Sequence, residues 1–127
     1  MLSNLRKLAK MPRLVSTPLR GIKLHEYQAG ALLDSYRVAI PLGEVASSVE
    51  EVGHLAKKFE GGCVVKSQVF AGGRGLGTFR ENGYKGGVKV VNDADEACEV
   101  AKNMLGNHLV TKQSGEEGLQ VQKLYLV

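Results

Sequence analysis

The chain has 127 residues, which is enough for one domain but too short for a multidomain enzyme. Its apolar content of 43% is typical of a soluble globular protein, and no apolar run approaches the roughly 18–20 residues that cross a bilayer. The net charge of +4 does not indicate a nucleic-acid-binding surface, because six basic and no acidic side chains fall in residues 1–23. Residues 24–127 are mildly acidic, so neither a nucleic acid nor a membrane is an expected partner.

Residues 1–21 combine basic and apolar positions without a single acidic residue. Leu2, Leu5 and Leu8 fall near one helical face, whereas Arg6 falls largely elsewhere. This amphipathic, basic pattern is typical of an organellar transit peptide, and it lacks the uninterrupted apolar core of a secretory signal. We therefore predict a transit peptide at 1–21 and a mitochondrial (matrix) location, or a hydrogenosome or related organelle. A disordered basic tail of a cytosolic protein is the alternative.

The segment 22–127 alternates helical and extended patterns, which predicts an α/β or α+β domain. Helical spacing of apolar residues, cap residues and glycine stops predict helices over 24–36, 48–59 and 94–105. β-Branched runs predict strands at 44–46, 63–68, 86–91, 109–113 and 119–127. Because the last strand runs to the final residue, we expect the chain to be a truncated piece of a longer domain.

Two cysteines, Cys63 and Cys98, match neither a C-x-x-C motif nor a zinc-site spacing. We predict that both are reduced and buried and behave as small hydrophobic side chains. A disulfide or a reactive thiol is the alternative.

The segment 64–77, VVKSQVFAGGRGLG, is the most informative stretch of the chain. A β-branched strand carries Lys66 and leads into a loop with four glycines around Arg74. Glycines let the backbone bend sharply and approach a ligand closely, and successive N–H groups in such a loop hold anions. The pattern predicts a phosphate cradle, and hence a nucleotide site.

The segment is neither of the two common phosphate motifs. A P-loop places its lysine after the glycines, whereas Lys66 precedes Gly73 by seven positions. The dinucleotide fingerprint G-x-G-x-x-G is also absent. A strand lysine combined with a flexible glycine-rich flap resembles the division of labour in protein kinases. The alternative is a glycine-rich hairpin whose charges are ordinary surface groups, with a polar and mobile tip at 80–85.

Five blocks in order closely resemble the N-terminal part of the β subunit of succinyl-CoA synthetase (succinate–CoA ligase). These blocks are LHEYQA at 24–29, VVKSQV at 64–69, AGGRG at 71–75, KGGVK at 85–89 and LGNHLVTKQ at 105–113. The resemblance covers essentially 22–127. It implies the N-terminal portion of an ATP-grasp fold, a mixed sheet flanked by helices with a glycine-rich nucleotide loop.

The same resemblance implies a function and a set of site residues. Lys66 matches the strand lysine that contacts nucleotide phosphates, and Gly73, Arg74 and Gly75 match the nucleotide-binding loop. Pro41 stands where ADP-forming and GDP-forming members differ, which favours ATP/ADP over GTP/GDP. The implied reaction interconverts succinyl-CoA, phosphate and nucleoside diphosphate with succinate, CoA and nucleoside triphosphate in the tricarboxylic acid cycle, in a heterodimer with an α subunit.

Several parts of that site lie outside this chain. The magnesium ligands and the α-contacting domain fall beyond Val127, so we expect no metal ligand and no catalytic residue among these residues, and no activity from the chain alone. The family's phosphorylated histidine belongs to the α subunit, so none of the histidines here inherits that role. Leu76 stands where many relatives carry lysine.

Two other functions stay open. The chain could be a truncated, non-catalytic paralogue that acts as a nucleotide-binding or interaction module. It could also be a stand-alone, kinase-like nucleotide binder.

Overall fold

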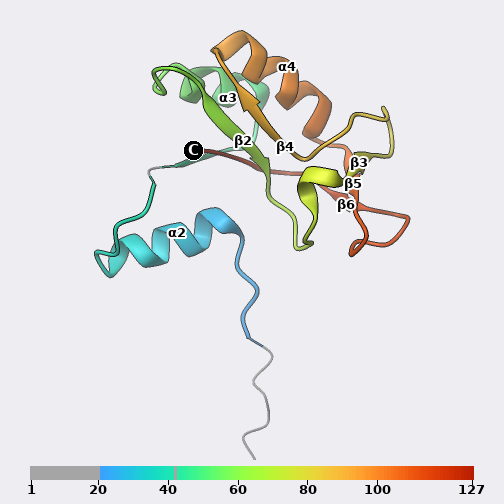
Figure 1. Cartoon of the computed structure of the whole chain (residues 1–127), viewed down its shortest axis with the longest axis horizontal. Coiled ribbons are helices and arrows are strands. Elements are labelled where there is room, and N and C mark those ends of the chain that lie inside the picture. The colour runs from blue at the N-terminus through green and yellow to red at the C-terminus, as the bar shows by residue number, and fades with distance from the viewer. Residues whose placement is uncertain (1–20, 42) are drawn as a thin grey trace, which may run out of the picture.

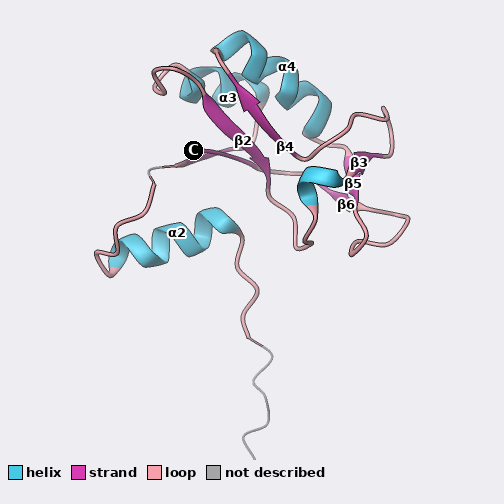
Figure 2. Ribbon diagram, in the orientation of Figure 1, coloured by secondary structure: helices cyan, strands magenta, loops and turns pink. Residues whose placement is uncertain are grey.

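The computed structural model of the chain describes residues 21–41 and 43–127, so the predicted transit peptide at 1–21 lies outside the described residues except for its last residue. Helices and strands alternate along the chain (Figure 2). The helices are α2 (Glu26–Ser35), α3 (Val49–Ala56) and α4 (Ala94–Met104), with a 3₁₀ turn η1 (Arg74–Leu76). The strands are β1 (Glu44–Ala46), β2 (Cys63–Ser67), β3 (Thr78–Phe79), β4 (Val88–Val91), β5 (His108–Val110), β6 (Leu119–Gln120) and β7 (Leu124–Leu126).

The strands form two sheets, one in the order β1-β7-β2-β4 and one in the order β3-β5-β6. The expected α/β class is confirmed, but the sheet is not mixed: every strand pairing in the described residues is antiparallel. The physical reason is the position of β7. The α3 crossover makes β1 and β2 parallel to each other, and β7 lies between them and runs in the opposite direction.

The four-stranded sheet has two different faces because side chains alternate along each strand. In β2 the side chains of Cys63, Val65 and Ser67 are buried, whereas Val64 and Lys66 are half-buried. Helices α3 and α4 cover the buried face, and α2 lies on the other side of the sheet (Figure 1). The core between the sheet and the two helices is aliphatic, with Val52, Val65, Met104, Leu124 and Leu126 fully buried.

Each of the two core helices begins at a polar side chain that caps it. The Ser48 hydroxyl accepts a hydrogen bond from the Glu51 N–H at 3.2 Å, and the Asp93 carboxylate accepts one from the Glu96 N–H at 2.8 Å. Each side chain satisfies one of the N–H groups that a helix leaves free at its start. These caps fix where α3 and α4 begin.

Helix α2 is shorter than the predicted span 24–36 and has no buried residue. Leu32 and Leu33 remain 51% and 43% exposed. Apolar packing therefore contributes little to its placement, and polar contacts at its first turn matter more. None of the described helices combines the length and the apolar character that a membrane span needs.

Residues 78–79 belong to the second sheet, which the sequence did not predict, and the predicted polar tip at 80–85 follows them as a turn. Thr78 and Phe79 form β3 opposite Val110 and Leu109, and the Phe79 ring is completely buried. The polar residues that follow are also bonded: Arg80 donates to the Glu117 carbonyl at 3.0 Å. The prediction missed β3 because it is only two residues long and surrounded by polar residues.

Both cysteines are free thiols. Cys63 is buried, and burial raises the pKa of its thiol. Cys98 is only half-buried, on α4, and packs opposite Gly53 of α3, where a Cβ would come within 2.7 Å of its Sγ. The prediction of reduced thiols is confirmed, and that of burial holds for Cys63 alone.

Replacing Phe79 with alanine should destabilise the domain by about 3–5 kcal/mol, because it removes a fully buried ring from beside Leu109. Chemical denaturation monitored by circular dichroism measures this loss. Leu76→Ala, three residues earlier at a side chain that is 92% exposed, should change the free energy of unfolding by no more than about 0.5 kcal/mol. Equal stability of the two variants would contradict the anchoring role of Phe79.

Candidate functional site

Lys66 points from β2 toward the face of the sheet on which α2 lies. Its register partner in β7 is Tyr125, and directly paired residues of antiparallel strands share a face. Tyr125 also pairs with Val45 of β1, so the three side chains mark the α2 side. Lys66 is thus the one charged side chain of a strand whose opposite face is core.

The glycine-rich loop after β2 is held in a defined shape. Gly73 has φ 72°, in the left-handed region, and starts the 3₁₀ turn η1. The loop is closed from two sides: the Gly72 N–H donates to Gln113 Oε1 at 2.8 Å, and the Gly87 N–H donates to the Arg74 carbonyl at 2.8 Å. The tight loop therefore depends on contacts from the residue before β4 and from the segment after β5.

Three consecutive N–H groups of this loop make no hydrogen bond within the described part of the chain. Within the described part of the chain, no hydrogen-bond acceptor is found for the N–H groups of Gly73, Arg74 and Gly75. Gly75 has an ordinary φ, and a Cβ there would meet no atom within 4 Å. The chain's own packing does not require glycine at this position, whereas the close approach of a ligand to the backbone would.

Glu26, in the first turn of α2, contacts both predicted phosphate-binding cations. The Lys66 ammonium donates to Glu26 Oε1 at 2.7 Å, and the Arg74 guanidinium donates to Glu26 Oε2 at 3.0 Å. All three side chains are between 24% and 33% exposed, so water screens these ion pairs only in part. The sequence interpretation missed Glu26, although it lies in the quoted block at 24–29.

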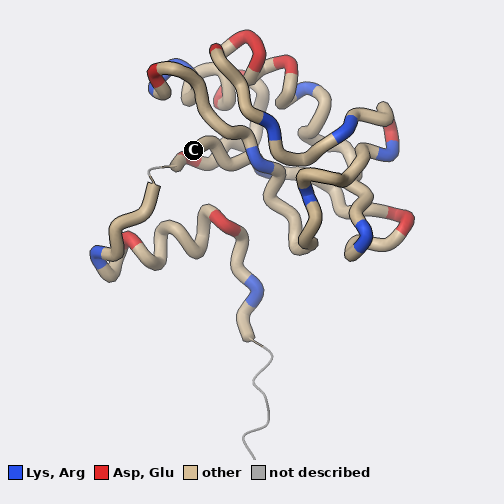
Figure 3. The backbone as a smooth tube through the Cα atoms, viewed as in Figure 1, with Lys and Arg blue, Asp and Glu red and all other residues tan. Residues whose placement is uncertain are grey.

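Arg74 is bound at a second point. Its Nη1 donates to the Ser67 carbonyl at 2.6 Å, which ties the loop back to the end of β2. One side chain thus joins the loop, the strand and, through Glu26, the first helix. Figure 3 shows basic positions gathered around the ends of β2 and β4 and the turn that follows β2.

The ion pairs determine the ionisation of Glu26. Partial burial raises the pKa of Glu26, but the hydrogen bonds and positive charges of Lys66 and Arg74 outweigh it, so that the pKa lies below its ordinary value of 4.5. Burial and then the charges of Arg74 and Lys123 lower the pKa of the neighbouring His25. Its imidazole stacks on Phe70 at 3.8 Å between ring centroids, which favours a packing role.

A cleft of 540 Å³ lies beside the loop. Its walls come from the start of α2 (24–26), the loop (71–75), Val69 and Val88. Lys66 does not line this cleft directly but contacts Glu26, which does. The cleft is therefore lined by Gly73, Arg74 and Gly75. Lys66 is linked to it only through Glu26.

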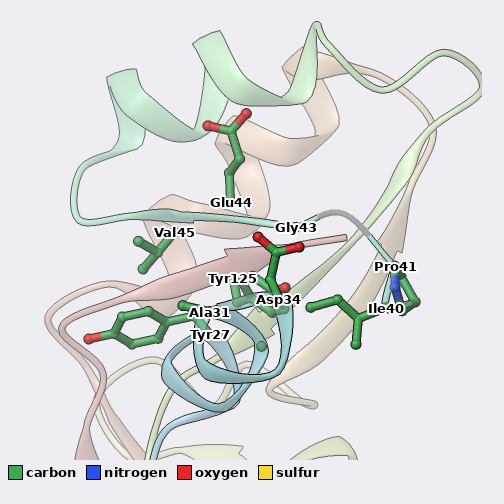
Figure 4. A pocket seen from close by; sticks show the side chains of 10 residues that line it. Tyr27, Ala31, Asp34, Ile40, Pro41, Gly43, Glu44, Val45 and Tyr125 are labelled. Atoms are coloured by element: carbon green, nitrogen blue, oxygen red, sulfur yellow. The ribbon is translucent and has the colours of Figure 1, made fainter. Parts of the chain in front are cut away.

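Pro41 lies in a different hollow, of 410 Å³, between α2 and the sheet. Figure 4 shows Pro41 and Ile40 at one end of this hollow and Tyr27 and Val45 at the other, with Tyr125 between them. The Tyr125 ring lies directly against Gly43, where a Cβ would come within 2.2 Å of it. Besides its aromatic and aliphatic residues the hollow is lined by the acidic residues Asp34 and Glu44, and the structure does not bring Pro41 to the glycine loop.

No described part of the chain contains a group of three or more His, Cys, Asp or Glu residues that could hold a metal ion. The two oxygens of Glu26 already contact Lys66 and Arg74. Among the described residues that line the cleft, the one acidic side chain is therefore already paired with two cations.

Comparison with known families gives the class of this domain. A family model described as the ATP-grasp domain matches residues 23–127, and the chain belongs to this family.

The relatives confirm the resemblance to one ligase subunit. The chain is 51% identical over 111 residues to the mitochondrial β subunit of ADP-forming succinate–CoA ligase of Arabidopsis thaliana, covering 85% of this chain and 26% of that protein. It is 46% identical over 103 residues to the corresponding subunit of Pelobacter propionicus, covering 81% of this chain and 24% of that protein. It is 45% identical over 130 aligned positions to the mitochondrial subunit of Solanum lycopersicum, covering 96% of this chain and 31% of that protein. The chain therefore spans about a quarter to a third of the length of these relatives.

The depressed pKa of Glu26 gives a testable pH dependence. Its ion pairs should contribute stability above pH 4.5, and this contribution should be lost as pH falls through the lower pKa of the folded state. A carboxyl ¹³C NMR titration should give a pKa below 4.5 for Glu26, and Lys66→Gln should raise it. An unchanged pKa in Lys66→Gln would contradict the ion pair.

Proposed function

We propose that this chain is the phosphate-binding part of the nucleotide site in the β subunit of a succinate–CoA ligase. The observation that carries the proposal is the cleft lined by Gly73, Arg74 and Gly75, whose three N–H groups have no acceptor in the described part of the chain. Lys66 is linked to this cleft through its contact with Glu26. Phosphoryl transfer depends mainly on positioning and on neutralising phosphate charge, and these groups supply both. The family and the relatives support this reading.

The roles within this site follow from geometry. The N–H groups of the loop would bind phosphate oxygens, because consecutive N–H groups of such a turn form an anion-binding nest. Lys66, on a rigid strand, and Arg74, tied to that strand, would provide the positive charge. The hollow that Pro41 lines would accommodate the base, and the ADP-forming relatives favour adenine.

The activity of the complete enzyme extends beyond this chain. It would interconvert succinyl-CoA, phosphate and ADP with succinate, CoA and ATP, together with an α subunit and with Mg²⁺ ligands supplied by residues outside the chain. The chain alone would be inactive. The plant mitochondrial relatives and the basic leader favour import into the mitochondrial matrix after removal of residues 1–21.

Replacing Lys66 with alanine should weaken ATP binding roughly ten- to hundredfold, because one charged phosphate contact is lost. Isothermal titration calorimetry on the chain measures this loss. In the complete subunit assembled with its α partner, the same variant should slow nucleotide-dependent succinyl-CoA formation.

Lys102→Ala is the matched control, because Lys102 lies on the outer side of α4 in an exposed pair with Glu99. ATP binding by Lys66→Ala as tight as by the unaltered chain would refute the phosphate site.

Replacing Pro41 with alanine should reduce the preference for ATP over GTP roughly tenfold, because it changes the wall of the hollow next to the base. Competition titrations with both nucleotides measure the ratio. Val38→Ala, in the same connection but outside the hollow, should keep the ratio. Equal binding of ATP and GTP by the unaltered chain would contradict the assignment of Pro41.

A further inference from the structure

Glu26 is the acidic residue that joins the two cations of the proposed phosphate site. One carboxylate oxygen accepts from Lys66 at 2.7 Å and the other accepts from Arg74 at 3.0 Å. These partners are 40 and 48 positions away in the sequence. The contact therefore exists only in the folded domain, and it brings a strand, a loop and a helix to one point.

Without Glu26 the two cations would repel each other. Both are held against the same carboxylate and are partly buried, so their mutual repulsion is only partly screened. Arg74 would keep its bond to the Ser67 carbonyl, whereas no other acidic partner of Lys66 is found in the described residues. The long, flexible Lys66 side chain would then lose its fixed direction.

Glu26 leaves both cations able to bind a phosphate. An ammonium has three N–H donors and a guanidinium has five, and each uses one on Glu26. Arg74 uses one more on the Ser67 carbonyl. The three side chains together keep one net positive charge, and Glu26 lines the same cleft as Gly73–Gly75.

Glu26 itself is held in place by the first turn of α2. The Tyr27 N–H donates to Gln68 Oε1 at 3.3 Å, and the His25 N–H donates to Gln28 Oε1 at 2.9 Å. These bonds fix the start of a helix that has no buried residue. The carboxylate is therefore fixed and can hold the flexible side chains of Lys66 and Arg74 in one direction.

We infer that Glu26 is a positioning residue that aims Lys66 and Arg74 at the polyphosphate chain of a nucleoside di- or triphosphate. This inference rests on the proposed function. Glu26 acts through the cations and makes no contact with the phosphates itself.

The test measures binding of ATP and of inorganic tripolyphosphate to the full chain by calorimetry. Glu26→Gln should weaken the binding of ATP and of tripolyphosphate roughly five- to tenfold, because the two cations stay in the site but are no longer held in direction. In a Lys66→Gln background, the additional effect of Glu26→Gln should fall below about twofold, since the two residues act as a unit. Glu99→Gln, which breaks an exposed ion pair of similar length on α4, should leave both affinities unchanged.

Thermal unfolding of each variant separates positioning from folding. Glu26→Asp, which retains the charge, should restore part of the affinity at equal thermal stability. Unchanged or tighter ATP binding in Glu26→Gln, while Lys66→Gln weakens it, would overturn this inference alone. The inference would also be overturned if the losses of affinity from Glu26→Gln and Lys66→Gln were fully additive in the double variant. Unchanged binding in Lys66→Gln would overturn the proposed function and this inference with it.

Discussion

The alternation of side chains along β2 is the constraint on which the rest of the domain depends. Val65 and its buried neighbours face α3 and α4, and this packing fixes the strand so firmly that Lys66 can only point the other way. A shift of one residue would place the lysine in the core and expose the valine, at a cost that the domain could not sustain. The charged side of the sheet is therefore defined by the apolar side, and the rigidity of the site comes from the core behind the sheet.

The charged side is organised by ion pairs, whereas apolar contacts organise the opposite side. Helix α2 buries no residue, so the bond from the Tyr27 N–H to Gln68 helps to place its first turn, and Glu26 joins that turn to Lys66. The loop is closed by Gln113 and by the backbone of Gly87, which come from two other parts of the chain. Few of these contacts are local in sequence, which makes the geometry of the cleft a product of the whole fold.

Much of the architecture could be predicted from sequence because its signals are local. Ser48 and Asp93 cap the helices at the predicted places, and the spacing of apolar residues predicted α3, α4 and β2. The predictions failed where the determining contact is distant. The last extended stretch, 119–127, divides into β6 and β7, which join different sheets. No local pattern reveals that Glu26 meets Lys66, because an acidic residue in a first turn is equally explained by the helix dipole. Nor does the sequence indicate that Pro41 and the glycine loop line two separate hollows.

The central place of β7 has a consequence for biosynthesis. Strands β1 and β2 are made early, but the strand between them is Leu124–Leu126, which leaves the ribosome after every other strand described. Until then the nascent chain exposes two unpaired strand edges, and such edges readily pair with other chains. Vectorial synthesis cannot complete this sheet stepwise, so the nascent domain depends on chaperones or on fast final closure to avoid aggregation.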